Sequence, residues 1–176
     1  MRLSRIGPDE VFHRFLTPKW AFLPTSGAGA AARGGRFNRP GVEALYLSRA
    51  PQTALEEYRQ GASIAPPATL AAYRVTLDKV VDLSSGYDPA VWNEAWADWA
   101  CAWKEIARID GATPPSWRLA DRLITDGLRG ILVPSLRHAG GVNLVIFNAA
   151  LTAADRLEAH DPDGLLPRDQ SSWDRP

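Results

Sequence analysis

The sequence predicts one α+β domain, with a mixed or mostly antiparallel sheet and flanking helices. Its 176 residues suit a single domain that buries a real core. Short apolar or alternating runs of strand length outnumber the helical segments. Glycine and proline breaks separate these runs, without the regular strand–helix alternation that is typical of a parallel α/β sheet. We find no internal repeat and no sign of a second domain.

Six segments have the composition of strands, after a short polar lead at residues 1–8. In the first of them, apolar and polar side chains alternate, which places His13 on one face and Arg14 on the other. The last is continuously apolar and is expected to be buried. The predicted strands occupy residues 10–15, 44–48, 69–77, 80–83, 130–134 and 142–147.

Three segments are predicted to be helices, at residues 51–60, 89–109 and 117–126, with a brief helical turn near residue 30. Pro51 stands in the first turn of the first helix and Gly61 follows its end, which are the positions that these residues favour. Asp88 and Pro89 are expected to begin the longest helix, and Ser116 is expected to cap the third.

The longest predicted helix carries four tryptophans at spacings of four, three and four residues: Trp92, Trp96, Trp99 and Trp103. This spacing places them on one helical face. Such a stripe is more often core than binding surface, so we expect it to be buried. The alternative is a groove for a partner protein, since exposed aromatic stripes tend to be interfaces.

Composition excludes several classes of function. Twenty basic and twenty acidic residues balance, which argues against direct nucleic-acid binding. A single cysteine excludes an internal disulfide, and three scattered histidines lack the spacing of metal ligands. No apolar run is long enough to span a membrane, so we expect a soluble cytoplasmic protein. Ser135 and His138 lack the G-x-S-x-G surroundings of a hydrolase nucleophile.

Residues 32–41 combine three arginines and three glycines. Glycine lets the backbone approach a ligand closely, and the planar guanidinium of arginine suits phosphate. The stretch is neither a P-loop nor a Rossmann turn, because the lysine and the glycine spacing of those motifs are missing. A strand with Tyr46 and a helix with the adjacent carboxylates Glu56 and Glu57 follow it directly.

The order of these parts resembles the RES domain, the toxin half of RES–Xre toxin–antitoxin pairs. The resemblance covers residues 10–150 and rests on Gly34-Gly35-Arg36-Phe37-Asn38, Leu45-Tyr46-Leu47, Pro51 with Ala54-Leu55 before Glu57, Val133-Pro134-Ser135, and Asn143-Leu144-Val145-Ile146-Phe147. It implies an ADP-ribosyltransferase-like split β-sandwich with a catalytic domain at residues 1–154. The sequence departs from the family pattern at Phe37, where many relatives have tryptophan, and at Leu136, where a small residue is common.

Residues 155–176 are polar and rich in proline, and we expect a poorly ordered tail or a loosely docked arm.

The resemblance implies that the chain acts on NAD as its substrate and needs no metal. It implies that Arg14 and Arg36 clamp the diphosphate, and that Tyr46 stacks against nicotinamide or the adjoining ribose. With Glu57, the resemblance makes Arg36 and Tyr46 the expected catalytic residues.

The ribose end of the substrate is assigned in the same way. Glu56 and Glu57 point about 100° apart on a helix, so at most one of them faces the same cleft as Tyr46. The family spacing, eleven residues after the tyrosine, selects Glu57. The resemblance implies that Glu57 bonds a ribose hydroxyl and stabilises the developing cation. Ser135 is expected to bond the ribose or the nicotinamide amide, and Asn143 to hold that loop or to contact NAD.

Three acceptors of ADP-ribose stay open: water, phosphate and a protein side chain. These would make the protein a glycohydrolase, a phosphorylase or an ADP-ribosyltransferase. The family also implies a partner, a Xre-type helix-turn-helix antitoxin that blocks the NAD cleft. An alternative function, of a different class, is a catalytically silent module that binds a nucleotide or a partner protein. Such a module would need the arginines but not Glu57.

Overall fold

The computed structural model describes residues 1–170, and the end of the predicted tail, residues 171–176, lies outside this part. Its strands are β1 (Leu3–Ile6), β2 (Val11–Leu16), β3 (Ala44–Ser48), β4 (Thr69–Asp82), β5 (Gly130–Pro134), β6 (Val142–Phe147) and β7 (Arg156–Ala159). Its α-helices are α1 (Ala28–Arg33), α2 (Pro51–Arg59), α3 (Trp103–Arg108) and α4 (Pro115–Thr125). Three short 3-10 helices are η1 (Pro18–Trp20), η2 (Glu94–Trp96) and η3 (Asn148–Ala150).

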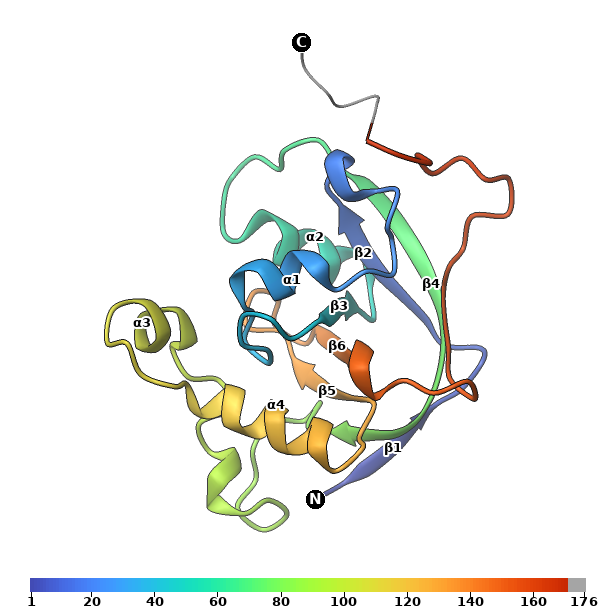
Figure 1. Cartoon of the computed structure of the whole chain (residues 1–176). Coiled ribbons are helices and arrows are strands. Elements are labelled where there is room, and N and C mark those ends of the chain that lie inside the picture. The colour runs from blue at the N-terminus through green and yellow to red at the C-terminus, as the bar shows by residue number, and fades with distance from the viewer. Residues whose placement is uncertain (171–176) are drawn as a thin grey trace.

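Strand β4 is the longest strand of a seven-stranded sheet and pairs with four others (Figure 1). It pairs antiparallel with β1, β2 and β7, and parallel with β5. The remaining neighbours, β2–β3, β3–β6 and β6–β5, are antiparallel. The pairings β4–β2–β3–β6–β5–β4 therefore close on themselves, which confirms the expected mixed, mostly antiparallel sheet.

The sequence predicts two strands where the structure has the single strand β4. The predicted break falls at Asp78 and Lys79, and Lys79 takes a left-handed backbone conformation with φ 55°. A non-glycine residue in this region is uncommon and marks a local bend. The pairing of β1 also shifts register here, between Ser4 and Ile6. The strand therefore bends at the polar pair and continues. Its first half pairs with β2 and β7, and the part after the bend pairs with β5.

The apolar side chains form two cores, one on each face of the strands. One core contains side chains from β2 to β6, including Phe12, Leu45 and Tyr73, and fills the space that these strands enclose. The other lies between the opposite face of β3, β5 and β6 and the chain that covers it, including Phe37 and Leu119. Helix α2 packs on this same outer face of the strands. The contact that shows this is the stacking of Phe15 of β2 on Tyr58 of α2, at 5.6 Å between ring centroids.

The tryptophans Trp92, Trp96, Trp99 and Trp103 are buried, as the core interpretation expects, with exposed fractions of 5%, 5%, 8% and 9%. The single helix predicted at residues 89–109 is wrong, because the chain forms turns, the short helix η2 and then α3. The first two tryptophans lie 4.7 Å apart between ring centroids, and three of the four join the core around α4. Tertiary packing overrides the local helical period here.

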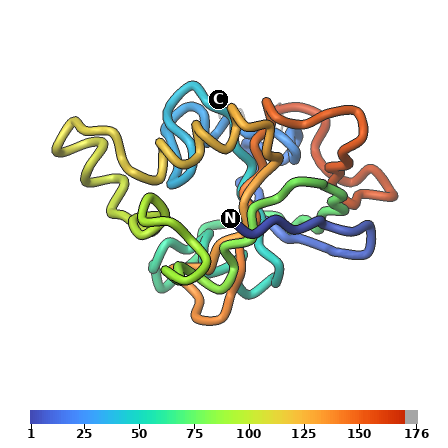
Figure 2. The backbone as a smooth tube through the Cα atoms, turned by 90° about the horizontal axis from the view of Figure 1, so that it is seen from below, coloured from blue at the N-terminus to red at the C-terminus, as the bar shows by residue number. Residues whose placement is uncertain are grey.

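Helix α4 begins at Pro115, earlier than predicted. Ser116 is fully buried inside the first turn and does not cap it; its hydroxyl lies 3.4 Å from the sulfur of Cys101. The segment around α3 projects from the body of the domain, as the yellow part of the chain shows in Figures 1 and 2. In the described part of the chain, no helix is both long and apolar enough to cross a membrane.

Both ends of the chain contribute strands that the sequence did not predict. The polar lead contains β1, and the region predicted as a tail contains β7, which pairs with β4. Leu157 and Ala159 of β7 pack against the enclosed core, so the sheet continues past the predicted boundary at residue 154. Each of these strands has only four residues, which leaves too short an alternation to recognise among polar neighbours.

An ion pair holds the start of this arm. Arg129 Nε lies 2.9 Å from Asp155 Oδ2, and the two side chains are only 16% and 6% exposed. Asp155 also accepts hydrogen bonds from the amide and hydroxyl of Thr152. Burial disfavours the charged carboxylate, but the bonds from Thr152 and Arg129 outweigh it and lower the pKa of Asp155.

Replacing Asp155 with asparagine should lower the free energy of unfolding by about 1–3 kcal/mol, because Arg129 keeps its charge without a partner. Because the folded-state pKa is lowered, the contribution is present at neutral pH and disappears as the pH falls below about 4. Urea unfolding of wild type and variant at both pH values measures this. Glu158→Gln, at an exposed pair with Arg156, is the control and should cost less than about 1 kcal/mol.

Candidate active site

A row of polar side chains crosses β2, β3 and β6 on the face toward α2. His13 lies directly opposite Ser48, and Ser48 lies directly opposite Asn143. Directly opposed residues of antiparallel strands share a face. Ser48 is buried, and its hydroxyl donates a hydrogen bond of 2.7 Å to Asn143 Oδ1. This leaves the amide nitrogen of Asn143 to donate toward α2.

Glu57 of α2 receives that nitrogen. Asn143 Nδ2 donates to Glu57 Oε1 at 2.6 Å, and Ser135 Oγ donates to the same oxygen at 2.7 Å. No hydrogen bond to the second oxygen, Oε2, is found within residues 1–170. The side chain is therefore fixed through one oxygen, while the other stays available. Its neighbour Glu56 points elsewhere, toward Arg59 at 3.3 Å.

The loop between β5 and β6 folds around Ser135. The serine hydroxyl accepts hydrogen bonds from the amides of Arg137 and His138, at 3.1 and 3.0 Å. His138 Nδ1 lies 2.9 Å from the hydroxyl of Thr53, which is buried on α2 one turn before Glu57. With its lone pairs occupied by two amides, the hydroxyl of Ser135 directs its proton to Glu57.

The arginine-rich loop is tied to β3 by Tyr46. The Tyr46 hydroxyl donates to Asn38 Oδ1 at 2.7 Å and accepts from the amide of Phe37 at 3.0 Å. Asn38 is buried, and its amide donates to three backbone carbonyls of the surrounding chain. A Cβ on Gly35 would overlap the Tyr46 hydroxyl, so this close approach needs glycine.

Burial raises the pKa of Tyr46, although the amide of Phe37 and the charge of Arg36 act in the opposite direction. The phenol is therefore protonated at neutral pH. Because its hydroxyl is used within the protein, the exposed part of the ring is what Tyr46 can offer a ligand.

Arg36 belongs to the loop that Tyr46 holds, and its charge interacts with that of Glu57. Its Nη1 donates to the backbone carbonyl of Cys101 at 2.6 Å. Burial lowers the pKa of Arg36, acidic groups around it, Glu57 among them, counteract this in part, and the nearby cation of Arg137 lowers it further. The site thus places one carboxylate among two guanidinium groups, and Arg137 is solvent-exposed.

Arg14 does not join this group. It follows His13 on β2, so its side chain lies on the opposite face, among the residues of the enclosed core. Its Nη1 donates to the carbonyl of Ser26 at 3.4 Å, and it interacts with Tyr73. Burial is the main reason that the pKa of Arg14 is lowered. Of the residues expected from the sequence, the structure gathers Arg36, Tyr46, Glu57, Ser135 and Asn143.

Sequence reasoning missed Ser48, Arg137 and Trp117 as neighbours of the site. Ser48 follows Tyr46 by two residues on one strand face, and that spacing was a usable signal. Arg137 is a further arginine on the loop that begins at Ser135. Trp117, whose indole donates to the carbonyl of Gly35, had no local signal, because only the fold brings α4 to this loop.

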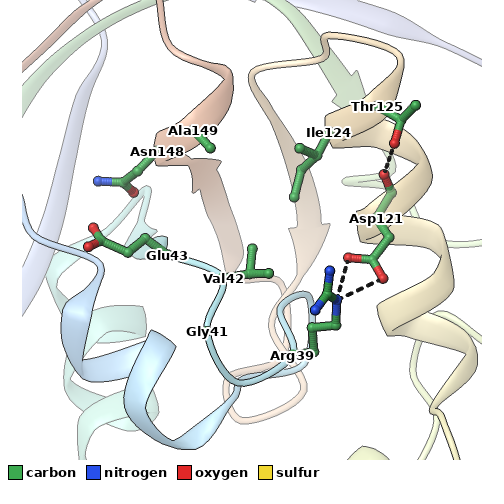
Figure 3. Close-up of a pocket in the computed structure, with 9 residues that line it drawn as sticks. All are labelled: Arg39, Gly41, Val42, Glu43, Asp121, Ile124, Thr125, Asn148 and Ala149. Carbon is green, nitrogen blue, oxygen red and sulfur yellow. Dashed lines mark hydrogen bonds and ion pairs between the residues drawn. The ribbon is translucent and has the colours of Figure 1, made fainter.

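A cavity of about 580 Å³ lies elsewhere, between the end of the arginine-rich loop, α4 and η3 (Figure 3). An ion pair between Arg39 and Asp121 closes one side, at 3.2 Å from Nε to Oδ2. Val42 and Ile124 line its interior. Glu57 and its partners do not line it, so we do not assign the candidate site to this cavity. Residues 1–170 contain no group of three or more histidine, cysteine or acidic side chains arranged to hold a metal ion.

Comparison with known proteins indicates the family and the fold of this chain. A sequence model of the RES domain matches residues 11–169. No curated protein matches the chain. Among solved structures, one that resembles the chain is the crystal structure of the M. tuberculosis MbcT–MbcA toxin–antitoxin complex, with a TM-score of 0.57. Sequence identity is 22%, over 89% of this chain and 84% of that chain. This likeness confirms the single-domain α+β fold with its mostly antiparallel sheet.

The match to the RES model extends from β2 through β7 and includes the arginine-rich loop, α2 and the loop after β5. The chain therefore belongs to the RES domain family.

Proposed function

We propose that this chain is the toxin of a toxin–antitoxin pair and that it cleaves NAD between nicotinamide and ribose, passing ADP-ribose to an acceptor. Three facts support the proposal: membership of the RES family, a fold like that of the MbcT–MbcA complex, and the grouping of Arg36, Tyr46 and Glu57. NAD is here a substrate. Since NAD is a metabolite of the cell interior, we place the activity in the cytoplasm.

The observation that carries the proposal is the fixed carboxylate of Glu57. Breaking the nicotinamide–ribose bond leaves positive charge on the ribose, as in glycoside hydrolysis. The electron pair of the bond stays with the nicotinamide nitrogen, so the leaving group is neutral and needs no general acid. A carboxylate held through Oε1 by Ser135 and Asn143 can present Oε2 to a ribose hydroxyl or to the developing cation.

The diphosphate needs cations, and Arg36 and Arg137 are the arginines near this carboxylate. Arg36 uses one nitrogen on the Cys101 carbonyl and keeps its other donors for phosphate. Arg137 stands on the exposed loop whose first residue, Ser135, bonds Glu57. We therefore assign the diphosphate to this pair. The sequence-based expectation assigned Arg14 together with Arg36, and the variants below discriminate between the two pairs.

Tyr46 would contribute its ring face, stacked on nicotinamide or on the adjoining ribose. Its hydroxyl holds Asn38 and Phe37 and so keeps the arginine-rich loop beside the carboxylate. Ser135 would first hold Glu57 and then bond ribose or the nicotinamide amide. Asn143 would hold Glu57 in the same way.

Three acceptors fit the same cleavage. In each, an oxygen or nitrogen of the acceptor forms the new bond to the ribose as the bond to nicotinamide breaks, and Glu57 Oε2 can orient the acceptor. Water or a protein side chain also gives up a proton to the solvent, whereas phosphate attacks through an oxygen that already carries negative charge. Water yields ADP-ribose, phosphate yields its phosphorylated form, and a protein side chain yields a modified protein. No contact in the site favours one of them.

The proposed partner is a Xre-type helix-turn-helix antitoxin that covers the cleft around Glu57. The MbcT–MbcA complex supports a toxin–antitoxin pair as such. The choice of this antitoxin type rests on the sequence resemblance alone.

Glu57→Gln should keep the fold and NAD binding but reduce kcat by about 10²-fold or more, because the negative charge opposite the cation is lost. NAD turnover with products separated by chromatography measures this, and radiolabelled NAD offered to lysate identifies the acceptor. Glu56→Gln is the matched control, because this adjacent carboxylate pairs with Arg59 and not with Ser135 or Asn143, and it should keep kcat within about twofold. Unchanged turnover in Glu57→Gln would refute the mechanism, and inactive wild type would favour a silent binding module.

Arg36→Ala and Arg137→Ala should each raise the KM for NAD by about tenfold or more, the loss expected for a charge-assisted hydrogen bond. Added salt should raise the KM of wild type more than that of either variant, because it screens these charges. Arg14→Ala should lower the melting temperature and leave KM within about threefold, since Arg14 contacts Ser26 and Tyr73. A tenfold rise in KM for Arg14→Ala would instead restore the pair expected from the sequence.

The antitoxin and NAD should compete for the same cleft. Purified Glu57→Gln chain, immobilised on a sensor, should bind the antitoxin with an apparent Kd that rises in proportion to added NAD. The arginine variants Arg36→Ala and Arg137→Ala should weaken the effect of NAD. An antitoxin affinity that stays constant at saturating NAD would mean that the partner binds elsewhere.

A further inference from the structure

Two parts of the chain that are far apart in sequence meet at the arginine-rich loop. The indole nitrogen Nε1 of Trp117 donates to the carbonyl of Gly35 at 2.7 Å. In the opposite direction, Arg36 Nη1 donates to the carbonyl of Cys101 at 2.6 Å. The tryptophan-rich region and the first turn of α4 thus hold the loop from the side away from β3.

The contact is also a packing contact. Gly34, with φ 75°, brings the backbone so close that a Cβ there would lie 3.2 Å from Cζ2 of Trp117. The indole in turn packs near Trp103, at 6.2 Å between ring centroids. Trp117 is partly buried, so its ring is confined between the loop and α3.

The carbonyl that Trp117 bonds belongs to Gly35, the residue directly before Arg36. The carbonyl of Gly35 and the amide of Arg36 belong to one planar peptide unit. Fixing that plane, together with the bonded amide of Phe37, limits the rotation of the backbone at Arg36 and so the direction in which its side chain leaves. On its other side the loop is held by the Tyr46 hydroxyl, which accepts from the amide of Phe37. Arg36 therefore stands between two anchors, one from β3 and one from α4.

We propose that Trp117 is a positioning residue, which acts through the Gly35–Arg36 peptide to hold the Arg36 guanidinium beside Glu57 for the substrate diphosphate. This inference rests on the proposed function for its ligand, the diphosphate of NAD. It also assigns a role to the tryptophan-rich region: Trp92, Trp96 and Trp99 build the core under α4, and α4 carries the indole to the loop.

Trp117→Phe is the variant to test, because it keeps an aromatic ring but removes the indole donor. It should raise the KM for NAD by about tenfold and leave kcat within about twofold, since one hydrogen bond to a carbonyl is worth about that factor in binding. In an Arg36→Lys background the same change should add almost nothing, because the two residues act in series. Steady-state kinetics of the four proteins measures both effects.

Trp92→Phe is the control, since Trp92 belongs to the same tryptophan-rich region, is more deeply buried than Trp117 and packs on Trp96. It also removes an indole donor and it perturbs the core under α4, but it should leave KM and kcat near wild-type values. Equal increases in KM for both variants would mean that Trp117 acts only through stability. An unchanged KM in Trp117→Phe, or full additivity with Arg36→Lys, would also overturn the inference.

Amide hydrogen exchange gives a readout that needs no turnover. In wild type the loop amides Gly35 and Phe37 are hydrogen-bonded to Asn38 O and to the Tyr46 hydroxyl. They should exchange about tenfold faster in Trp117→Phe and at the wild-type rate in Trp92→Phe. If the loop amides exchange faster in Trp117→Phe but the wild-type protein does not turn over NAD, the proposed function is wrong and the structural role of Trp117 still holds. Unchanged exchange would refute the anchor itself, and faster exchange with an unchanged KM would refute its link to the substrate.

Discussion

The hydrogen bonds that Glu57 receives join three separate parts of the fold. Asn143 reaches it from β6, Ser135 from the loop after β5, and the carboxylate itself comes from α2. A carboxylate with two short donors on one oxygen is held in one orientation, while its other oxygen has no donor in the described chain. These bonds connect α2 and the β5–β6 loop to the sheet, together with the contact of Thr53 with His138 and the stacking of Phe15 on Tyr58. The hydroxyl of Ser48 donates to the side-chain oxygen of Asn143 and so orients its nitrogen toward Glu57.

The cationic side of the site depends on a second constraint, the close approach of the arginine-rich loop to its surroundings. Gly35 admits the Tyr46 hydroxyl, and Gly34 admits the indole of Trp117. The loop is thus held from both sides by groups that lie far from it in the sequence. Without these anchors, a glycine-rich loop would pay a large conformational entropy to bring Arg36 beside Glu57. The buried tryptophans therefore serve the site through packing.

Local patterns predicted the elements wherever local physics was strong enough. Pro51 and Gly61 marked α2, and the apolar runs marked β5 and β6 close to their observed bounds. The failures share one cause. The tryptophan spacing predicted a helix that core packing replaced with turns, and Asp78–Lys79 suggested a break where the structure has a bend inside β4. Strands β1 and β7 were too short to recognise, because their partner β4 supplies what their own sequence lacks.

The sequence by itself determined the class of fold, the family, and the chemical character of the residues around Glu57. It did so because helical and strand periods, glycine positions and the spacing from Tyr46 to Glu57 are local properties of the chain. Only the tertiary structure decided which side chains meet. Alternation on β2 turns Arg14 to the enclosed core, while the β5–β6 loop and α4 bring Arg137 and Trp117 to the site. These contacts depend on strand register and packing, which no local pattern encodes.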